Sequence, residues 1–466
     1  MKKILFLILL SAISFLYFQS FTLFSTTTIA NEKPVPIPPS QQRTGNAVKG
    51  YKYLTEGDYV KGGIPYEFAL MATGGKNKKF YLQREGLNGK ISHEYTVVTA
   101  PNGEKLAAPN CMQCHAQVFD SALYIGMGNT FIDFSLGDKL NAGNFQMLEK
   151  LLQKQSPSKY EAAKNFITVS KTIGPKIGTA VRGVNSADRL AAVLAAHRDP
   201  VTFKWQQQAL LELTNEVIPS DVPAWWLLKK KNAMFYNGFG RGDFGKFLMA
   251  SNLLTVNDTA ESREVDSHIS DVLAYIYTLE APKYPKTINV ALAKTGEALF
   301  IKNCSKCHGE YGKEEKYPNL LIPESIIKTD SFLYKSNYQY PQFIKWFNSS
   351  WFATGSHPAR LEPFEGYIAP PLDGIWVTAP YLHNGSVPTL EALLNSKIRP
   401  AYWSRDFNTP VYDYVKIGWQ YTAHNAPGGT TIYNTALPGY GNYGHNFGDK
   451  LSDTERKAVI EYLKTL

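Results

Sequence analysis

All four cysteines of this chain lie in two C-x-x-C-H segments, and no other feature of the sequence constrains the fold as strongly. Two thiols at this spacing can each form a thioether bond with one haem vinyl group, while the adjacent histidine reaches the iron. The pattern therefore predicts two covalently bound c-type haems. Their expected cofactor-binding residues are Cys111, Cys114 and His115 in the first motif and Cys304, Cys307 and His308 in the second.

Other uses of paired cysteines explain the pattern less well. A thioredoxin-like redox pair also has the spacing C-x-x-C, and paired C-x-x-C segments can bind zinc. Neither site needs a histidine directly after the second cysteine. Four cysteines in an exported chain would ordinarily suggest two disulfides, but here both pairs are consumed by the same motif.

The N-terminus has the pattern of an export signal. Lys2 and Lys3 form a short basic start, residues 4–18 are apolar, and small residues precede Asn31. We predict a signal peptide over residues 1–30, and the alternative is an uncleaved membrane anchor. A cleaved signal peptide and an uncleaved anchor would both direct the chain to export, so we expect a periplasmic or secreted protein.

Composition and charge set broad limits on the function. The chain has 466 residues, of which 44% are hydrophobic, which is sufficient for two or three domains with buried cores. Its formal net charge of +9 suits a small acidic redox partner protein, although an ordinary surface of mixed charge explains it equally well. The basic run Lys229–Lys231 is most simply a solvated turn, and the alternative is pairing with haem propionates. No pattern points to nucleic acid.

The chain divides into segments of different composition. We predict a signal peptide over residues 1–30, an extended proline-rich linker over residues 31–50, and two cytochrome c-like haem domains over residues 51–285 and 286–466. An apolar stripe at helical spacing runs from Asp266 to Leu279 and is followed by Pro282. This stripe marks the closing helix of the first domain.

Helices are also expected on both sides of the second motif. Residues 291–302 run into the motif, and residues 451–466 open with a capping box formed by Ser452 and Glu455. Further helical patterns occur at residues 144–153, 186–196 and 204–216. We therefore predict a mainly α fold, with two cytochrome c-like haem domains, long loops and little β structure.

The second haem needs a ligand opposite the motif histidine, usually Met or His. None of the seven methionines follows Met249, so a ligand from the second domain must be a histidine. We expect His445, because its glycine-flanked loop can lay an imidazole over the haem face. His383 is the alternative, either as ligand or as a hydrogen-bonding neighbour, while His357 and His424 read as structural or exposed. This predicts a bis-His haem of low potential, suited to electron transfer.

The first motif has no obvious second ligand. After His115 the next histidine is His197, and the nearby sulfur ligands are Met127 and Met147, whose alternative role is core packing. An aromatic group follows at residues 225–236. Such side chains would keep the site dry and leave the iron open, and an ordinary aromatic core beside a buried haem explains them as well.

The two motifs, together with P-P-L-D-G-I-W at Pro370–Trp376 and A-P-Y-L-H-N-G-S at Ala379–Ser386, resemble the bacterial dihaem cytochrome c peroxidase superfamily. The likeness is closest to the rubber oxygenase A-like branch, whose dihaem proteins cleave polyisoprene. The chain departs from the peroxidases, since it has no methionine for the second haem and no histidine shortly after the first motif. Both departures fit the oxygenase-like plan.

That resemblance implies a first haem open to a small reactant, dioxygen or hydrogen peroxide, inside an aromatic and aliphatic pocket. It implies that Trp225, Trp226 and Phe235 line the distal side as catalytic residues. It also implies a hydrophobic substrate, and it leaves a bound calcium ion open as a further cofactor.

Two functions follow from these observations. The first is an exported dihaem c-type cytochrome oxidoreductase, in which the first haem activates dioxygen or peroxide and the bis-His second haem transfers electrons. The alternative is a non-catalytic dihaem electron-transfer cytochrome c, in which Met127 or Met147 closes the first haem. The state of the first haem therefore decides whether the protein is an enzyme.

Overall fold

The computed structural model describes residues 33–73, 80–135 and 137–466, so the predicted signal peptide lies outside the described residues. Within these ranges, no helix combines the length and the apolar character that crossing a bilayer requires. The α-helices are α2 (Ala47–Glu56), α3 (Tyr66–Thr73), α4 (Met112–His115), α5 (Gly137–Gln155), α6 (Pro157–Ile173), α7 (Ala187–Ala196), α8 (Phe244–Leu248), α9 (Thr259–Thr278), α10 (Val290–Asn303), α11 (Ser305–His308), α12 (Glu324–Ile327), α13 (Phe332–Gln339), α14 (Gln342–Ser349), α15 (Leu390–Leu394) and α16 (Asp453–Leu463).

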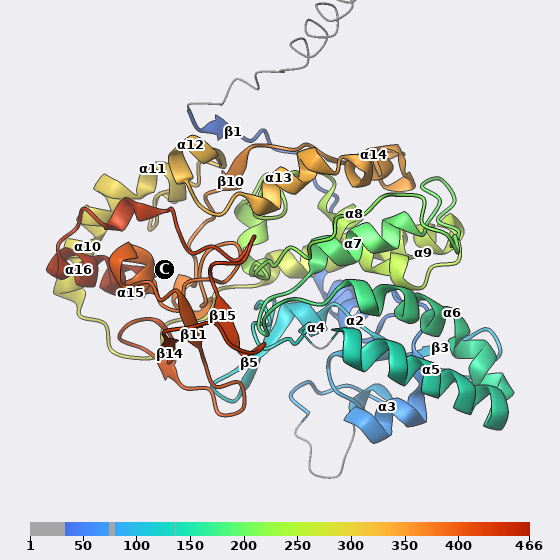
Figure 1. Ribbon diagram of the computed structural model, residues 1–466. Helices are drawn as coiled ribbons and strands as arrows, with labels where there is room; N and C mark the ends of the chain where they lie inside the picture. The colour runs from blue at the N-terminus through green and yellow to red at the C-terminus, as the bar shows by residue number, and fades with distance from the viewer. Residues whose placement is uncertain (1–32, 74–79, 136) are drawn as a thin grey trace, which may run out of the picture.

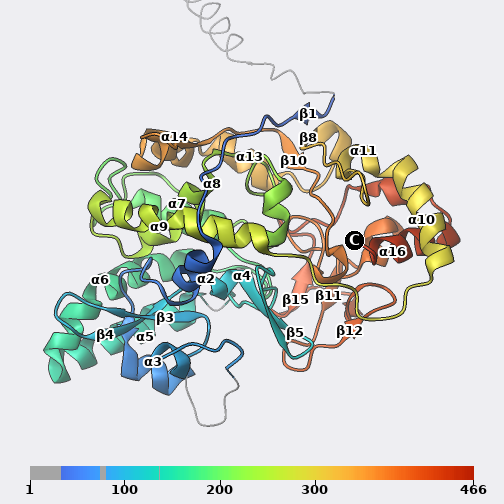
Figure 2. The same ribbon diagram turned by 180° about the vertical axis from the view of Figure 1, so that it is seen from behind.

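Each C-x-x-C-H motif belongs to a region framed by two helices that touch at a glycine. In the first region α2 packs against α9, and in the second α10 packs against α16 (Figures 1 and 2). A Cβ atom on Gly50 of α2 would lie 1.8 Å from the carbonyl oxygen of Asp271. A Cβ atom on Gly296 of α10 would lie 1.9 Å from that of Ala458. Only glycine permits backbones to approach so closely, so the two helix pairs share one packing device.

The glycine of α10 allows a test of this packing. Gly296→Ala is expected to lower the free energy of unfolding by about 1–3 kcal/mol, because its methyl group overlaps the Ala458 carbonyl. Chemical denaturation of the holoprotein measures this change. Gly143→Ala in α5 is the matched control, because no atom lies within 4 Å of its Cβ position; it should raise stability by up to about 1 kcal/mol through helix propensity. Equal stability of Gly296→Ala and the wild type would contradict the close contact.

Several predicted helices are present and one is absent. The helix before the second motif is α10, and the last helix, α16, begins with the predicted Ser452–Glu455 capping box. The helix predicted over residues 204–216 was wrong, since this stretch forms turns and bends. Its backbone bonds instead to the end of α7, with the N–H groups of Gln206 and Leu210 donating to the carbonyls of His197 and Ala196.

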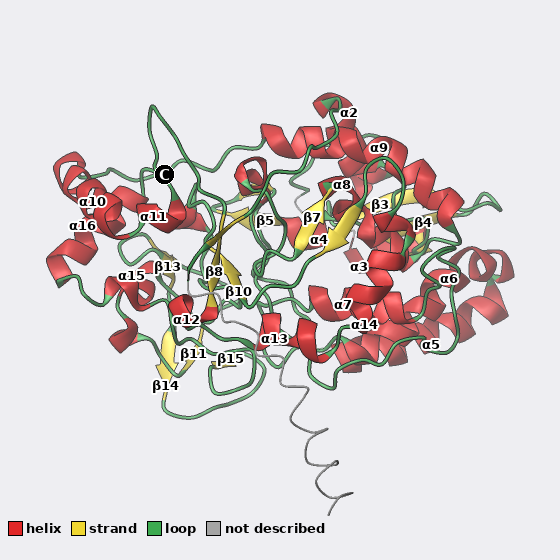
Figure 3. Ribbon diagram, turned by 90° about the horizontal axis from the view of Figure 1, so that it is seen from above, coloured by secondary structure: helices red, strands yellow, loops and turns green. Residues whose placement is uncertain are grey.

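The prediction of a mainly α fold with little β structure was also wrong. Helices make up 40% and strands 14% of the structure, and the strands form several small sheets (Figure 3). Strands of two to five residues inside long loops are too short to show an alternating pattern, which is why the sequence did not reveal them. The strands are β1 (Val35–Pro36), β2 (Ile64–Pro65), β3 (Tyr95–Thr99), β4 (Lys105–Pro109), β5 (Ala116–Phe119), β6 (Ala122–Ile125), β7 (Gly240–Gly242), β8 (Leu320–Pro323), β9 (Ala359–Leu361), β10 (Gly366–Ile368), β11 (Tyr402–Ser404), β12 (Tyr412–Asp413), β13 (Gly418–Trp419), β14 (Thr422–His424) and β15 (Ile432–Asn434).

The antiparallel sheets join segments far apart in the chain. In the sheet β1-β8-β10, Val35 pairs with Leu321, so the start of the described chain is tied to its second half. In the sheet β7-β9, Gly240 pairs with Leu361. Between β1 and α2 the chain runs in an extended conformation along the molecule (Figure 2), and α2 begins at Ala47, inside the stretch predicted as linker.

Two large buried cores each draw on both halves of the chain. The first core surrounds Trp225 and Phe244 and includes Trp346 and Phe352 from the second half. The second core contains Trp376 together with Trp226 and other residues of the first half. Helix α14 accordingly packs against α7, and its Phe347 stacks on Phe247 of α8 with ring centroids 5.2 Å apart (Figure 1). Residues from both sides of the predicted boundary at residue 285 therefore pack together in the same cores, and the division into domains stays a prediction.

Candidate haem sites

The second motif forms the short helix α11, which ends at Gly309 with φ of 88°. The Nδ1 atom of His308 lies 2.8 Å from the carbonyl oxygen of Pro370. Because a carbonyl only accepts hydrogen bonds, Nδ1 must carry the proton, which leaves Nε2 as the free ligand atom. Burial lowers the pKa of His308, which also favours the neutral imidazole. The residue is therefore oriented as an iron ligand.

His445 faces His308. The two ring centroids lie 6.1 Å apart with an interplanar angle of 63°. Two imidazoles bound on opposite sides of one metal ion would have centroids about 6 Å apart, given metal–nitrogen bonds of about 2 Å. Burial, and to a smaller extent His308, lowers the pKa of His445 to about 3, so its imidazole is neutral. The pair fits the predicted bis-His haem.

The other histidines of the second half lie elsewhere. His383 is 6% exposed and stacks on Tyr367 at 4.3 Å, with its Nε2 atom 3.2 Å from the Tyr367 hydroxyl. The Nε2 atom of His424 lies 2.8 Å from the hydroxyl oxygen of Ser404, and His357 is exposed. The geometry thus favours His445 over His383 as the partner of His308, and it gives His383 a buried hydrogen-bonding position.

The first motif places His115 at the end of α4, beside an aromatic ring instead of a second imidazole. Its ring stacks on Trp225 with centroids 4.4 Å apart and an interplanar angle of 17°. The backbone N–H of Trp225 donates to Gly126, whose own N–H donates to the His115 carbonyl, so a short ladder holds the two residues together. Burial lowers the pKa of His115 to about 3. A neutral, fixed imidazole suits a haem ligand.

The three aromatic residues that the resemblance assigns to the distal side have different surroundings. Trp225 lies beside the expected iron ligand itself. Trp226 is 2% exposed, belongs to the second core and donates its indole N–H to the Asp373 carbonyl at 2.9 Å. Phe235 packs its ring on Phe239 and Phe247. Trp225 and Phe235 thus pack in the first core and Trp226 in the second, and the distal role of all three stays a prediction.

The sulfur ligands considered for the first haem have different surroundings. Met147 is 69% exposed on α5, whereas Met127 is 1% exposed and packs in the second core. His197 is buried, with Nδ1 lying 3.0 Å from the Gln206 carbonyl, and His268 stacks on Tyr53. Among the described residues, no methionine or histidine is found in ring or hydrogen-bond contact with His115.

None of the four cysteines forms a disulfide, and their assignment to haem attachment stays a prediction. Burial raises the pKa of Cys114 to about 12 and that of Cys304 to about 11. In the described ranges, no group of three or more His, Cys, Asp or Glu side chains could hold a metal ion. The buried Nδ1 atoms of His115 and His445 likewise have no partner within the described chain.

The basic run differs from its predicted role as a solvated turn. The run closes the 3-10 helix η3 (Trp225–Lys230), where Lys229 pairs with Glu280 at 2.5 Å and Lys230 pairs with Asp373 at 2.5 Å. Burial lowers the pKa of Lys231 to about 8. The turn therefore connects the region of the first motif with that of the second.

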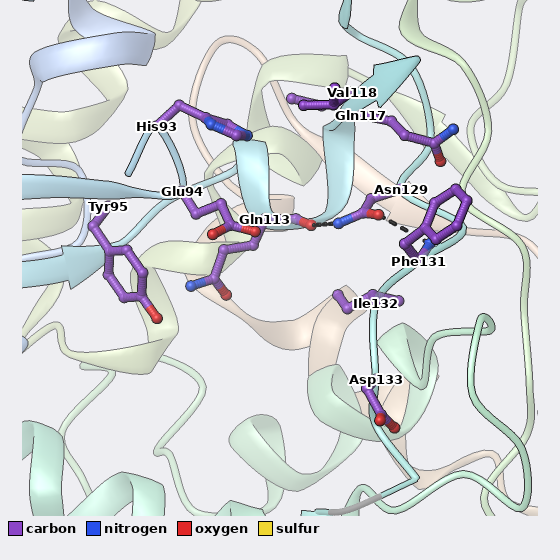
Figure 4. A pocket seen from close by; sticks show the side chains of 11 residues that line it. His93, Glu94, Tyr95, Gln113, Gln117, Val118, Asn129, Phe131, Ile132 and Asp133 are labelled. Atoms are coloured by element: carbon purple, nitrogen blue, oxygen red, sulfur yellow. Dashed lines mark hydrogen bonds between the residues drawn. The ribbon is translucent and has the colours of Figure 1, made fainter. Parts of the chain in front are cut away.

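A cavity of about 470 Å³ opens beside the first motif (Figure 4). Gln113, inside the motif, lines it, and Asn129 joins the Gln113 carbonyl to the backbone N–H of Phe131. Its lining combines carboxylate and amide side chains with apolar ones. The full lining consists of His93, Glu94, Tyr95, Gln113, Ala116, Gln117, Val118, Asn129, Phe131, Ile132 and Asp133.

The sequence did not reveal the residues whose contacts with the two histidines involve backbone carbonyls. The carbonyl of Pro370 accepts the hydrogen bond from His308, and every residue has a carbonyl, so the residue type gave no sign of this role. Arg399, which contacts the loop of His445, was missed because it lies far from that loop in the chain. One general rule could have indicated such a partner: a histidine that binds a metal usually donates its other ring N–H to an acceptor.

Comparison with known proteins gives one family match and two similar proteins. Residues 366–404 match the family model described as RoxA-like, cytochrome c-like. Two proteins of Sinorhizobium fredii (strain NBRC 101917 / NGR234) are similar. Uncharacterized protein y4iM is 27% identical over 288 residues, which cover 53% of this chain and 64% of that protein. Uncharacterized protein y4iJ is 44% identical over 111 residues, which cover 22% of this chain and 18% of that protein.

The chain therefore spans less than two thirds of either relative. The family match and the two C-x-x-C-H motifs identify a haem-containing c-type cytochrome, with a likeness to the RoxA-like cytochromes. The match does not extend to the dihaem peroxidase superfamily as a whole.

Proposed function

We propose that this protein is an exported dihaem c-type cytochrome oxidoreductase with one open and one closed haem. Two c-type haems would supply one-electron chemistry, and the open one would supply reactivity toward dioxygen or peroxide. One asymmetry carries the proposal. His308 has a second imidazole at 6.1 Å, whereas His115 has the indole ring of Trp225 at 4.4 Å.

The surroundings of the first motif support an open site. Trp225 fixes the ring of His115 by stacking and offers no atom that can bind iron. Two methionines could close this site. Met147 is exposed, and Met127 is packed in the second core. The cavity beside Gln113 offers a route by which a small reactant could approach the motif.

The connection between the motifs supports electron exchange. Trp225 contacts His115, and its neighbour Trp226 donates a hydrogen bond to the carbonyl of Asp373. Asp373 lies three residues after Pro370, whose carbonyl accepts from His308. One turn of η3 therefore bridges the two sites, so electrons taken from a small redox partner at one haem could reach the other.

Binding of carbon monoxide tests the proposal directly. The fully reduced holoprotein is expected to bind one carbon monoxide per chain rapidly, because an iron with a free position takes this ligand at once, whereas the second haem must first lose His445. Stopped-flow absorbance after mixing measures how many molecules bind in the fast phase. No fast binding would mean that both haems are closed and that the protein is an electron carrier; fast binding of two would contradict the closed second haem.

A further inference from the structure

The loop that carries His445 is held mainly by side chains of residues 384–399, while the Asp330 carboxylate accepts from the Gly441 N–H at 2.9 Å. His445 has φ of 46° and the preceding Gly444 has φ of 76°, so both adopt the left-handed conformation. A Cβ atom on Gly444 would lie 2.2 Å from the Lys328 carbonyl. Few residues other than glycine adopt this conformation, and histidine is among those that adopt it more often than most. The backbone that presents the His445 ring therefore turns at two successive residues, and contacts from elsewhere in the fold bear on how firmly it is held.

Arg399 makes the largest set of these contacts. Its Nη1 atom donates to the carbonyls of Asn442 and Gly444, both at 2.7 Å, and its Nη2 atom donates to the His445 carbonyl at 3.3 Å. The same guanidinium donates to Ala392 through Nε at 3.1 Å and to Leu393 through Nη2 at 2.9 Å, at the end of α15. One planar group thus ties the loop to a helix, and its fork of donors has no equivalent in lysine.

Two residues of the H-N-G-S sequence hold the start of the same loop. The Asn384 amide donates to the carbonyls of Gly439 and Gly441 at 3.0 and 2.9 Å, and the Ser386 hydroxyl donates to the latter at 3.0 Å. Both side chains are fully buried, so these hydrogen bonds do not compete with water. The contacts of Asn384, Ser386 and Arg399 together cover the loop from residue 439 to residue 445.

We propose that Arg399, supported by Asn384 and Ser386, is the positioning residue that holds His445 opposite His308. The inference rests on the proposed bis-His ligation of the second haem. All three residues lie within residues 366–404, the segment that matches the family model. This segment is a scaffold for the ligand loop: it supplies no iron ligand of its own, and it sets how readily the sixth position opens.

The test compares Arg399→Ala and Arg399→Lys with the wild type. Uptake of carbon monoxide by the reduced second haem requires departure of His445. Its rate is expected to rise about tenfold in Arg399→Ala, equivalent to about 1.4 kcal/mol. Arg399→Lys should show an intermediate rate, because an ammonium group reaches fewer carbonyls. Far-UV circular dichroism at the same temperature confirms that each variant is folded.

Two further variants separate the possible failures. Arg189→Ala is the matched control, because Arg189 also donates to backbone carbonyls, those of Lys176 and Thr214, at a distance from both motifs. It should leave uptake unchanged. His445→Ala shows the fully open rate. If it behaves like the wild type, the proposed ligation fails. If His445→Ala opens the haem while both Arg399 variants keep the wild-type rate, the ligation stands and the positioning role is overturned. Should Arg399→Ala not accumulate as holoprotein, Arg399→Lys decides.

Discussion

Replacing Cys304 and Cys307 together with serine is expected to remove one of two covalently bound haems and to leave the other attached. Each thioether needs a thiol, and a serine hydroxyl does not add to the vinyl group in its place. The haem content per chain, measured as the pyridine haemochrome after denaturation and acid-acetone extraction, should fall to half. Haem that resists this extraction is covalently bound, so the measurement counts attachment rather than affinity.

The reciprocal variant makes this prediction specific. Replacing Cys111 and Cys114 with serine should also halve the covalent haem, and the residual spectra of the two variants should differ because their ligands differ. Ser305→Ala, inside the second motif, is the control and should retain both haems. Full haem content in either double variant would contradict attachment at that motif.

His445→Ala is expected to convert the second haem from a low-spin, six-coordinate centre to one that binds external ligands. The substitution removes the imidazole at 6.1 Å from His308 and leaves no other described histidine in contact with the His308 ring. The low-spin signal of this haem in the electron paramagnetic resonance spectrum should be lost. Rapid binding of carbon monoxide after reduction should rise from one to two per chain.

Two histidines of the same half serve as comparisons. His424→Ala, which removes only a hydrogen bond to Ser404, should leave both signals unchanged. His383→Ala removes a buried ring that stacks on Tyr367, so it should lower stability without changing the ligands. Loss of the low-spin signal in His383→Ala, together with its retention in His445→Ala, would reverse the ligand assignment.

The parts of the fold that could be predicted have strong local signals. Helices α10 and α16 were predicted because their apolar spacing, and for α16 its capping box, are readable within one segment. The short strands were not, because partners such as Gly240 and Leu361 pair across a long stretch of chain. The irregular residues 204–216 were misread as a helix because their backbone groups bond to α7, a tertiary effect that overrides local pattern.

The candidate site divides in the same way. The motif residues, and the glycine-flanked loop of His445, carry chemistry in their own sequence. The sequence shows Trp225 and Trp226 as adjacent aromatic residues. It could not predict that their side chains pack in different cores. The hydrogen bonds of Arg399 to residues 442–445 could not be predicted, because an arginine can reach any carbonyl that the fold brings near it.

The central claim is that the first haem is open and the second is closed by His308 and His445. The most direct measurement is the electron paramagnetic resonance spectrum of the oxidised holoprotein, recorded as isolated and again after addition of imidazole. We expect one low-spin signal that imidazole leaves unchanged and a second signal that imidazole converts to a new low-spin form. Two low-spin signals that both ignore imidazole would contradict the account and would identify the protein as an electron carrier.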